Sequence, residues 1–180
     1  GSAGYCGKLL ADMGADVIKI EPPGGDSARS IPPFAGSQPG PNRSLEFLYL
    51  NANKRSVALD LARDSDRQRF RRLADSAALI VENLSPGTLD SWDLGFESLR
   101  AGHPELVLTS ITGFGQSGPH RDFRSGDLVA SAMGGSMYVT GEPENPPVRL
   151  AGNQTVITAC ATAAASSLIA LHHSRRSGHG

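Results

Sequence analysis

Cysteines, aromatic side chains and any surplus of one charge are scarce in this chain of 180 residues. Its 17 Lys and Arg are balanced by 18 Asp and Glu, so nucleic acid is not a favoured partner. The only cysteines, Cys6 and Cys160, match no metal-ligand or redox spacing. They predict small buried thiols in a reducing compartment, not a disulfide framework. No metal site is expected.

Long apolar runs are also missing. The longest weakly polar stretch, residues 156–171, contains four Ser and Thr and is expected to be too short and too polar to span a bilayer. No basic region followed by an apolar core stands at the start, so no signal peptide is expected in this segment. A cytoplasmic enzyme or binding domain without a membrane partner is the default expectation.

Strand-like and helix-like segments alternate along the chain. Apolar patterning predicts strands at residues 17–20, 56–61, 79–81 and 106–111, and helices at 8–13, 65–77, 128–137 and 159–171. This alternation predicts a single α/β domain with a parallel sheet flanked by crossover helices. A helix precedes the first buried strand, which suggests that the strand before that helix is missing.

Residues 22–44 are so rich in Pro and Gly that no regular structure is expected there. Loops of this length inside a compact domain are usually either functional or disordered, and the sequence leaves both alternatives open.

The most informative stretch is residues 106–127. An apolar run ends at Gly113, Gly115 and Gly118, and four charged side chains follow within the next nine residues. This pattern predicts a buried strand that leads into a polar loop, the place where α/β proteins bind ligands. An ordinary strand-to-helix connection fits the spacing equally well. A P-loop and an α/β-hydrolase elbow are absent, and a dinucleotide site is not expected.

Five segments together resemble the family III CoA-transferases, a group that includes formyl-CoA transferase, carnitine CoA-transferase and 2-methylacyl-CoA racemase. They are LLADMGADVIKIEPPGGDSAR, NANKRSVALDL, VENLSPGTLDSWDLGFESL, SITGFGQSGP and SRRSGHG. The resemblance covers the whole chain, which corresponds to the first half of the family's length, after its first strand. It implies a Rossmann-like large-domain segment, an interlocked homodimer, and coenzyme A at the carboxyl ends of the strands.

The resemblance also implies where coenzyme A binds. Asn83 is expected to hydrogen-bond the adenine or ribose, and Arg124 to neutralise a phosphate. Two basic contacts of the family are replaced, by Pro22 and Ser91. The implied contacts, transferred position by position, are Leu59, Asp60, Asn83, Leu84, Arg124, Ser125, Gly126 and Asp127.

The catalytic position departs from the family. Family transferases use an Asp at the start of the helix after a PP-containing loop, whose carboxylate attacks the acyl-CoA carbonyl. That position is Val156 here, or Asn153 if the alignment is gapped, and neither side chain can form the mixed anhydride. Asp127 is the only nearby carboxylate that could act as nucleophile or orient the CoA thiol.

The chain is therefore expected to belong to an enzyme that moves coenzyme A between an acyl-CoA and a carboxylic acid. One alternative is a catalytically inactive CoA-binding half of a tandem or heteromeric assembly. Another is a 2-methylacyl-CoA racemase-like enzyme, which needs a His directly before the Asp. Gly126 stands there instead, and His120 would have to serve as a relocated base, although a surface-loop His is the simpler interpretation.

Overall fold

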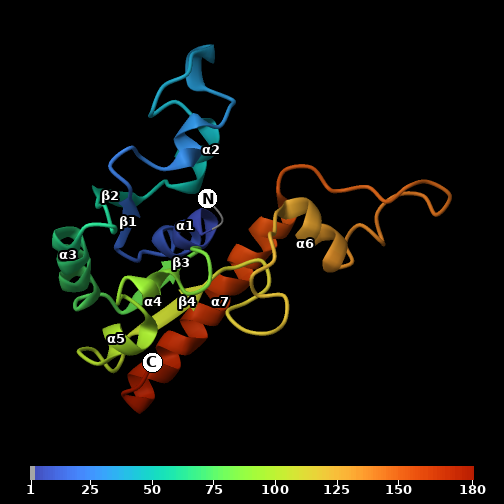
Figure 1. Ribbon diagram of the computed structural model, residues 1–180. Helices are drawn as coiled ribbons and strands as arrows, with labels where there is room; N and C mark the ends of the chain where they lie inside the picture. The colour runs from blue at the N-terminus through green and yellow to red at the C-terminus, as the bar shows by residue number, and fades with distance from the viewer. Residues whose placement is uncertain (1–2) are drawn as a thin grey trace.

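The computed structural model describes residues 3–180 and shows parallel strands flanked by helices (Figure 1). Strand β1 (Val17–Glu21) pairs with β2 (Lys54–Ala58), and β3 (Leu79–Glu82) pairs with β4 (Val107–Ser110). The α/β class and the parallel pairing are therefore confirmed. The described residues form two parallel pairs and not one continuous sheet, because no ladder joins β1 to β3.

Both strand pairs nevertheless lie between the same two helical layers. On one side, α1 (Gly4–Asp12) and α7 (Gln154–Ser177) pack against Val17 of β1 and against Leu79 and Val81 of β3. On the other side, α3 (Asp64–Ala74), α4 (Thr88–Ser91) and α5 (Phe96–Arg100) cover the strands. The main core lies on this second side, and its fully buried centre includes Leu94 and Leu106.

Several element boundaries differ from the predicted ones. Strand β2 begins at Lys54, two residues early, because its parallel register pairs Lys54 with Val17 and Ala58 with Glu21. Helix α3 begins at Asp64, whose carboxylate accepts a hydrogen bond of 2.7 Å from Gln68 Nε2. The predicted end of α1 is confirmed, since Gly14 takes a left-handed φ of 99° and closes the helix.

Helix α7 is longer than the predicted 159–171 and extends over 24 residues. By length and composition it could cross a membrane, so the expectation based on residues 156–171 was wrong on that point. In this fold α7 packs against α1 and β4 and buries Cys160, Ala164 and Ser167. These small residues allow α7 to approach α1 and β4 closely, and Ser167 Oγ lies 2.7 Å from Thr109 Oγ1 of β4.

Residues 22–44 form a long connection between β1 and α2. They contain the short 3-10 helices η1 (Ser27–Ser30) and η2 (Ala35–Ser37), so the expectation of no regular structure was wrong. An antiparallel bridge between Phe34 and Ser44 closes the segment just before α2 (Leu45–Leu50). The segment folds back on itself and returns to the sheet.

Candidate functional site

The loops that follow β3 and β4 meet at the carboxyl ends of these two strands. Gln116 Nε2 donates to Glu82 Oε1 over 3.3 Å, and the backbone N–H of Ile111 donates to the Glu82 carbonyl over 2.9 Å. A cavity of about 200 Å³ lies between these strand ends and the α4–α5 segment, and the loop after β4 contributes Gln116 to it. Its polar lining consists of Glu82, Ser85, Asp90, Ser110 and Gln116.

Glu82 holds the turn that carries Asn83 and Leu84. One of its carboxylate oxygens accepts from the backbone N–H of Leu84 at 2.6 Å, while the other accepts from Gln116. Asn83 is exposed, and Leu84 packs against the main core. Glu82 thus fixes the turn relative to the loop after β4, a role for which the sequence around Glu82 carries no local signal.

The loop after β4 folds tightly on itself. A Cβ atom at Gly113 would lie 2.0 Å from Ser125 Cβ, so glycine is required for this approach. Arg124, Ser125 and Gly126 are exposed. Within residues 3–180, Arg124 forms no ion pair, which leaves its guanidinium free for an anion.

Gly113, Gly115 and Gly118 have the spacing of the dinucleotide fingerprint GxGxxG, a match that the sequence-based expectation did not take into account. In that fingerprint a helix opens on the glycines and receives the pyrophosphate at its N-terminus. Here α6 (Asp127–Met133) begins nine residues after Gly118. The glycines therefore shape a loop and do not form that phosphate site.

His120 lies within a small aromatic group of the same loop. Its ring is 4.9 Å from that of Phe123 and 6.0 Å from that of Phe114, measured between centroids. It is exposed to solvent. These contacts favour the surface-loop interpretation of His120.

Leu59 and Asp60 follow β2, and they do not line the cavity. Leu59 is buried in the main core, and its backbone N–H donates to the Glu21 carbonyl over 2.9 Å. The carboxylate of Asp60 accepts from the backbone N–H of Ala62 at 3.1 Å and pairs with Arg63 at 3.2 Å. The structure therefore brings the β3 turn and the β4 loop together and places Leu59 and Asp60 in the other strand pair.

Asp127 is the first residue of α6, yet its carboxylate lies at the start of α7. Its Oδ1 accepts from the backbone N–H groups of Thr155 at 3.1 Å and Val156 at 3.4 Å. Its Oδ2 pairs with Arg149 at 2.9 Å, and the side chain is 7% exposed. Because the first N–H groups of a helix have no partner within it, this carboxylate caps α7 from outside.

Asn153 and Val156, the two positions aligned with the family nucleophile, lie at the start of α7. Asn153 precedes α7 in a left-handed conformation with φ of 54°, and its side chain makes no capping hydrogen bond. Val156 packs in the cluster between α1 and α7. The carboxylate at this helix start therefore comes from Asp127, 29 residues before Val156 in the chain.

Both cysteines are fully buried, which confirms the prediction of buried thiols. Burial raises the pKa of the Cys6 thiol to about 11. Among residues 3–180 no group of three His, Cys, Asp or Glu side chains is placed to hold a metal ion.

Parallel strands flanked by helices, with polar loops at the carboxyl ends of the strands, define a protein of the Rossmann-like α/β class. The sequence model of CoA-transferase family III matches residues 1–180. The chain belongs to CoA-transferase family III.

Named relatives and a solved structure agree with this assignment. Succinyl-CoA:mesaconate CoA-transferase of Haloarcula hispanica is 41% identical over 180 residues, which cover 98% of this chain and 46% of the relative. Succinyl-CoA:(R)-benzylsuccinate CoA-transferase subunit BbsE of Thauera aromatica is 42% identical over 176 residues, 98% of this chain and 43% of the relative. A CAIB/BAIF family protein from Brucella suis superimposes with a TM-score of 0.89 at 35% identity, covering 98% of this chain and 47% of that chain. The chain thus spans about half the length of these relatives.

Proposed function

We propose that this chain is part of an acyl-CoA transferase, which moves coenzyme A between an acyl-CoA and a carboxylic acid. The observation that carries the proposal is the meeting of the β3 turn and the β4 loop around one cavity. These are two of the three segments that the family resemblance assigns to coenzyme A. The relatives described above are themselves named CoA-transferases.

Exposed polar groups of the β3 turn and of the loop after β4, which do not line the cavity itself, suit the parts of coenzyme A. The amide of Asn83 offers both a donor and an acceptor to the adenine or ribose, and the exposed Arg124 offers a cation to a phosphate. Ser125 and Gly126 offer hydroxyl and backbone donors beside it. Leu59 would contribute through its backbone carbonyl, since its side chain is in the core and its N–H donates to Glu21. The backbone N–H of Asp60 donates to Asp66 and its carbonyl accepts from Arg63, so Asp60 would contribute through its carboxylate.

Asp127 remains the candidate for chemistry. In the transferase reaction a carboxylate attacks the acyl carbonyl, the CoA thiolate leaves, and a mixed anhydride forms. The three donors that hold the Asp127 carboxylate withdraw electron density from it and fix its position. They favour an orienting role for Asp127 at the start of α7 over attack as a nucleophile.

Replacement of Asp127 by Asn tests both roles in the purified full-length protein. We expect transferase activity to fall about tenfold or more, because the amide cannot reproduce the charged contacts to Arg149 and α7. Hydroxylamine trapping of the wild-type protein incubated with acyl-CoA reports an acyl-enzyme. Activity that is unchanged in Asp127→Asn would remove Asp127 from the mechanism.

A second candidate function is a CoA-binding half without its own catalysis, in a tandem or heteromeric assembly. It is favoured by the lack of a carboxylate at Val156 and Asn153, and by the name of the relative BbsE as a subunit. Calorimetric titration with coenzyme A, followed by assays of the protein alone and mixed with a family member that carries the Asp, separates the two candidates. Binding of coenzyme A by the protein alone, with activity only after mixing, supports the inactive CoA-binding half.

A racemase-like function is not favoured, because His120 packs among aromatic rings and Gly126 precedes Asp127.

We also infer an interlocked homodimer in a cytoplasmic setting. Helix α6 and the chain that follows it extend away from the body of the protein (Figure 1). This arm, residues 127–152, exposes Met133, Tyr138 and Val139 by 69%, 90% and 79%. Apolar side chains displayed in this way fit an association surface, and two buried thiols fit a reducing compartment.

A further inference from the structure

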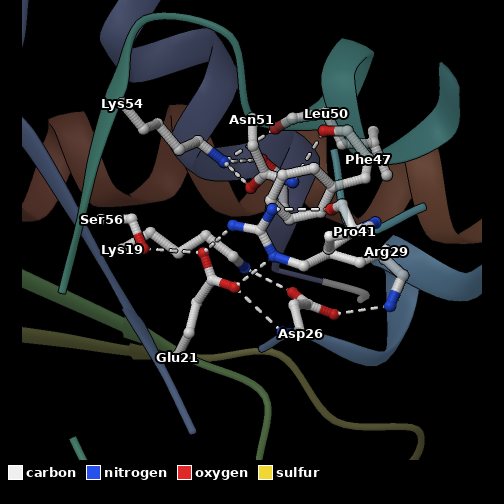
Figure 2. A network of polar contacts seen from close by, with 12 residues as sticks. Lys19, Glu21, Asp26, Arg29, Pro41, Phe47, Leu50, Asn51, Lys54 and Ser56 are labelled. Carbon is white, nitrogen blue, oxygen red and sulfur yellow. Dashed lines mark hydrogen bonds and ion pairs between the residues drawn. The ribbon is translucent and has the colours of Figure 1, made fainter. Parts of the chain in front are cut away.

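A second polar cluster lies at the carboxyl end of β1, where Glu21 and Arg29 form a two-pronged ion pair (Figure 2). Arg29 Nε donates to Glu21 Oε2 over 2.7 Å, and Arg29 Nη2 donates to Glu21 Oε1 over 2.8 Å. Ser56 Oγ and the backbone N–H of Asp26 also donate to this carboxylate, at 2.7 and 2.9 Å. Glu21 is only 3% exposed, so its charge is compensated within the fold.

The remaining guanidinium nitrogen of Arg29 reaches the far end of the Pro- and Gly-rich segment. Its Nη1 donates to the Pro41 carbonyl over 2.9 Å and to Asn42 Oδ1 over 2.7 Å. The guanidinium also lies 3.8 Å from the ring centroid of Phe47 in α2. One side chain therefore joins the end of β1 to residues 41–42 and to α2.

These contacts leave Arg29 little capacity to bind a ligand itself. Both of its terminal nitrogens and Nε are engaged by oxygens of the chain. Its charge is neutralised by Glu21, and one face is covered by Phe47. Arg29 thus acts as a clamp: it holds residues 41–42, at the far end of the 22–44 segment, to Glu21 at the end of β1. The ion pair between Lys19 and Asp26, at 2.5 Å, holds the near end of the same segment to β1.

The clamp adjoins one part of the proposed coenzyme A site. The backbone carbonyl of Glu21 accepts from the N–H of Leu59 over 2.9 Å, immediately before Asp60. Ser56, which donates to the Glu21 carboxylate, lies on β2, the strand that leads to these residues. The Glu21 backbone is therefore one hydrogen bond away from Leu59.

We propose that Arg29 is a positioning residue for coenzyme A binding, which clamps residues 22–44 to the end of β1 and so keeps the backbone at Leu59 and Asp60 in its binding geometry. This inference rests on the proposed function. It assigns to Arg29 no contact with the ligand, and it gives the Pro- and Gly-rich segment a role in the site.

The test compares Arg29→Met and Arg29→Lys with Arg43→Met in the full-length protein. Arg43 is a suitable control because it lies in the same segment, is exposed, and its side chain makes no hydrogen bond or ion pair within residues 3–180. Thermolysin cleavage of residues 30–45 measures whether the segment is fastened. Calorimetric titration with coenzyme A measures the site, and the KM and kcat for acyl-CoA are measured where the protein turns over.

We expect Arg29→Met to be cleaved about tenfold faster and to bind coenzyme A about tenfold more weakly, the scale of one lost charged hydrogen bond. KM should rise while kcat stays within about twofold, and Arg29→Lys should be intermediate because an ammonium cannot bridge Glu21 and Asn42 together. Cleavage equal to that of Arg43→Met, or faster cleavage with unchanged affinity for coenzyme A, overturns the inference.

Two further results keep the comparison decisive. If Arg29→Met does not fold, Asn42→Ala, which removes one of the two hydrogen bonds from Arg29 to the far end of the segment, should show the same effects at smaller size. If the wild-type protein itself binds no coenzyme A, the proposed function fails and with it the positioning role, while the cleavage rates still show whether Arg29 fastens the segment.

Discussion

Glu21 gives the protein a specific sensitivity to acid. The Arg29 guanidinium, assisted by Ser56 and the backbone of Asp26, lowers the pKa of the Glu21 carboxyl from 4.5 to about 2. A carboxyl whose pKa is depressed in the folded state stabilises the fold above its unfolded pKa, and this contribution is lost as the pH falls through the folded pKa. This lowering of the pKa adds about 3 kcal/mol to the free energy of unfolding at neutral pH, and about 2 kcal/mol of that contribution is lost by about pH 3.

Replacement of Glu21 by Gln should therefore reduce the free energy of unfolding at neutral pH and flatten its dependence between about pH 5 and pH 2. Urea denaturation at a series of pH values measures both effects. Glu97→Gln is the control, because the Glu97 side chain is 83% exposed. Equal acid sensitivity of Glu21→Gln and the wild type would contradict this account of Glu21.

The two cysteines should be inert in the folded protein. Cys6 and Cys160 are fully buried, and burial raises the pKa of both thiols. Because the thiolate is the reactive form, we expect labelling by a disulfide reagent such as DTNB to be slower by about 100-fold or more than in guanidinium. Rapid labelling of the native protein at neutral pH would show that the cluster between α1 and α7 opens readily.

At the scale of elements, local signals in the sequence predict local structure well. The apolar stripe of α3, with Phe70 and Ala74 buried, and the left-handed glycine that ends α1 both follow from residues close together in the chain. The length of α7 was underestimated because polar residues begin and end it, Gln154 and Thr155 at the start and residues 174–177 at the end. Polar ends of a helix carry no apolar periodicity, and here they are stabilised by contacts with distant residues.

The candidate site, too, could be predicted only where its signals are local in the sequence. The polar loops after β3 and β4 could be located from the strand-end pattern and the family resemblance. The capping of α7 by Asp127 and the clamp of Arg29 on Asn42 could not, because each joins residues 13 or more apart through side chains. The separation into two strand pairs also has no local signal, since a strand's partner is not encoded in its own pattern.

The loop after β4 depends on Gly113 as a structural element. Replacement by Ala would place Cβ 2.0 Å from Ser125 Cβ, so either Gly113 or the segment from Ser125 must move. We expect a loss of about 1–3 kcal/mol in unfolding free energy and weaker binding of coenzyme A, measured by denaturation and calorimetry. Gly24→Ala is the matched control, because nothing lies within 4 Å of its Cβ position. Normal coenzyme A affinity in Gly113→Ala would separate this loop from the site.

At the scale of the whole molecule, the arm of residues 127–152 predicts self-association. The arm exposes Met133, Tyr138 and Val139, while its helix α6 is anchored to α7 through the 2.6 Å contact between Ser131 Oγ and Thr155 Oγ1. Exposed apolar side chains on a projecting segment are unfavourable in a monomer, so a second copy should cover them.

Light scattering of the full-length protein should therefore give the mass of a dimer, and the double variant Tyr138→Asp, Val139→Asp should shift it toward the monomer. Glu144→Gln, an exposed polar change on the same arm, should leave the mass unchanged. A wild-type protein that stays monomeric at about 50 µM, well above a micromolar dissociation constant, would contradict the homodimer.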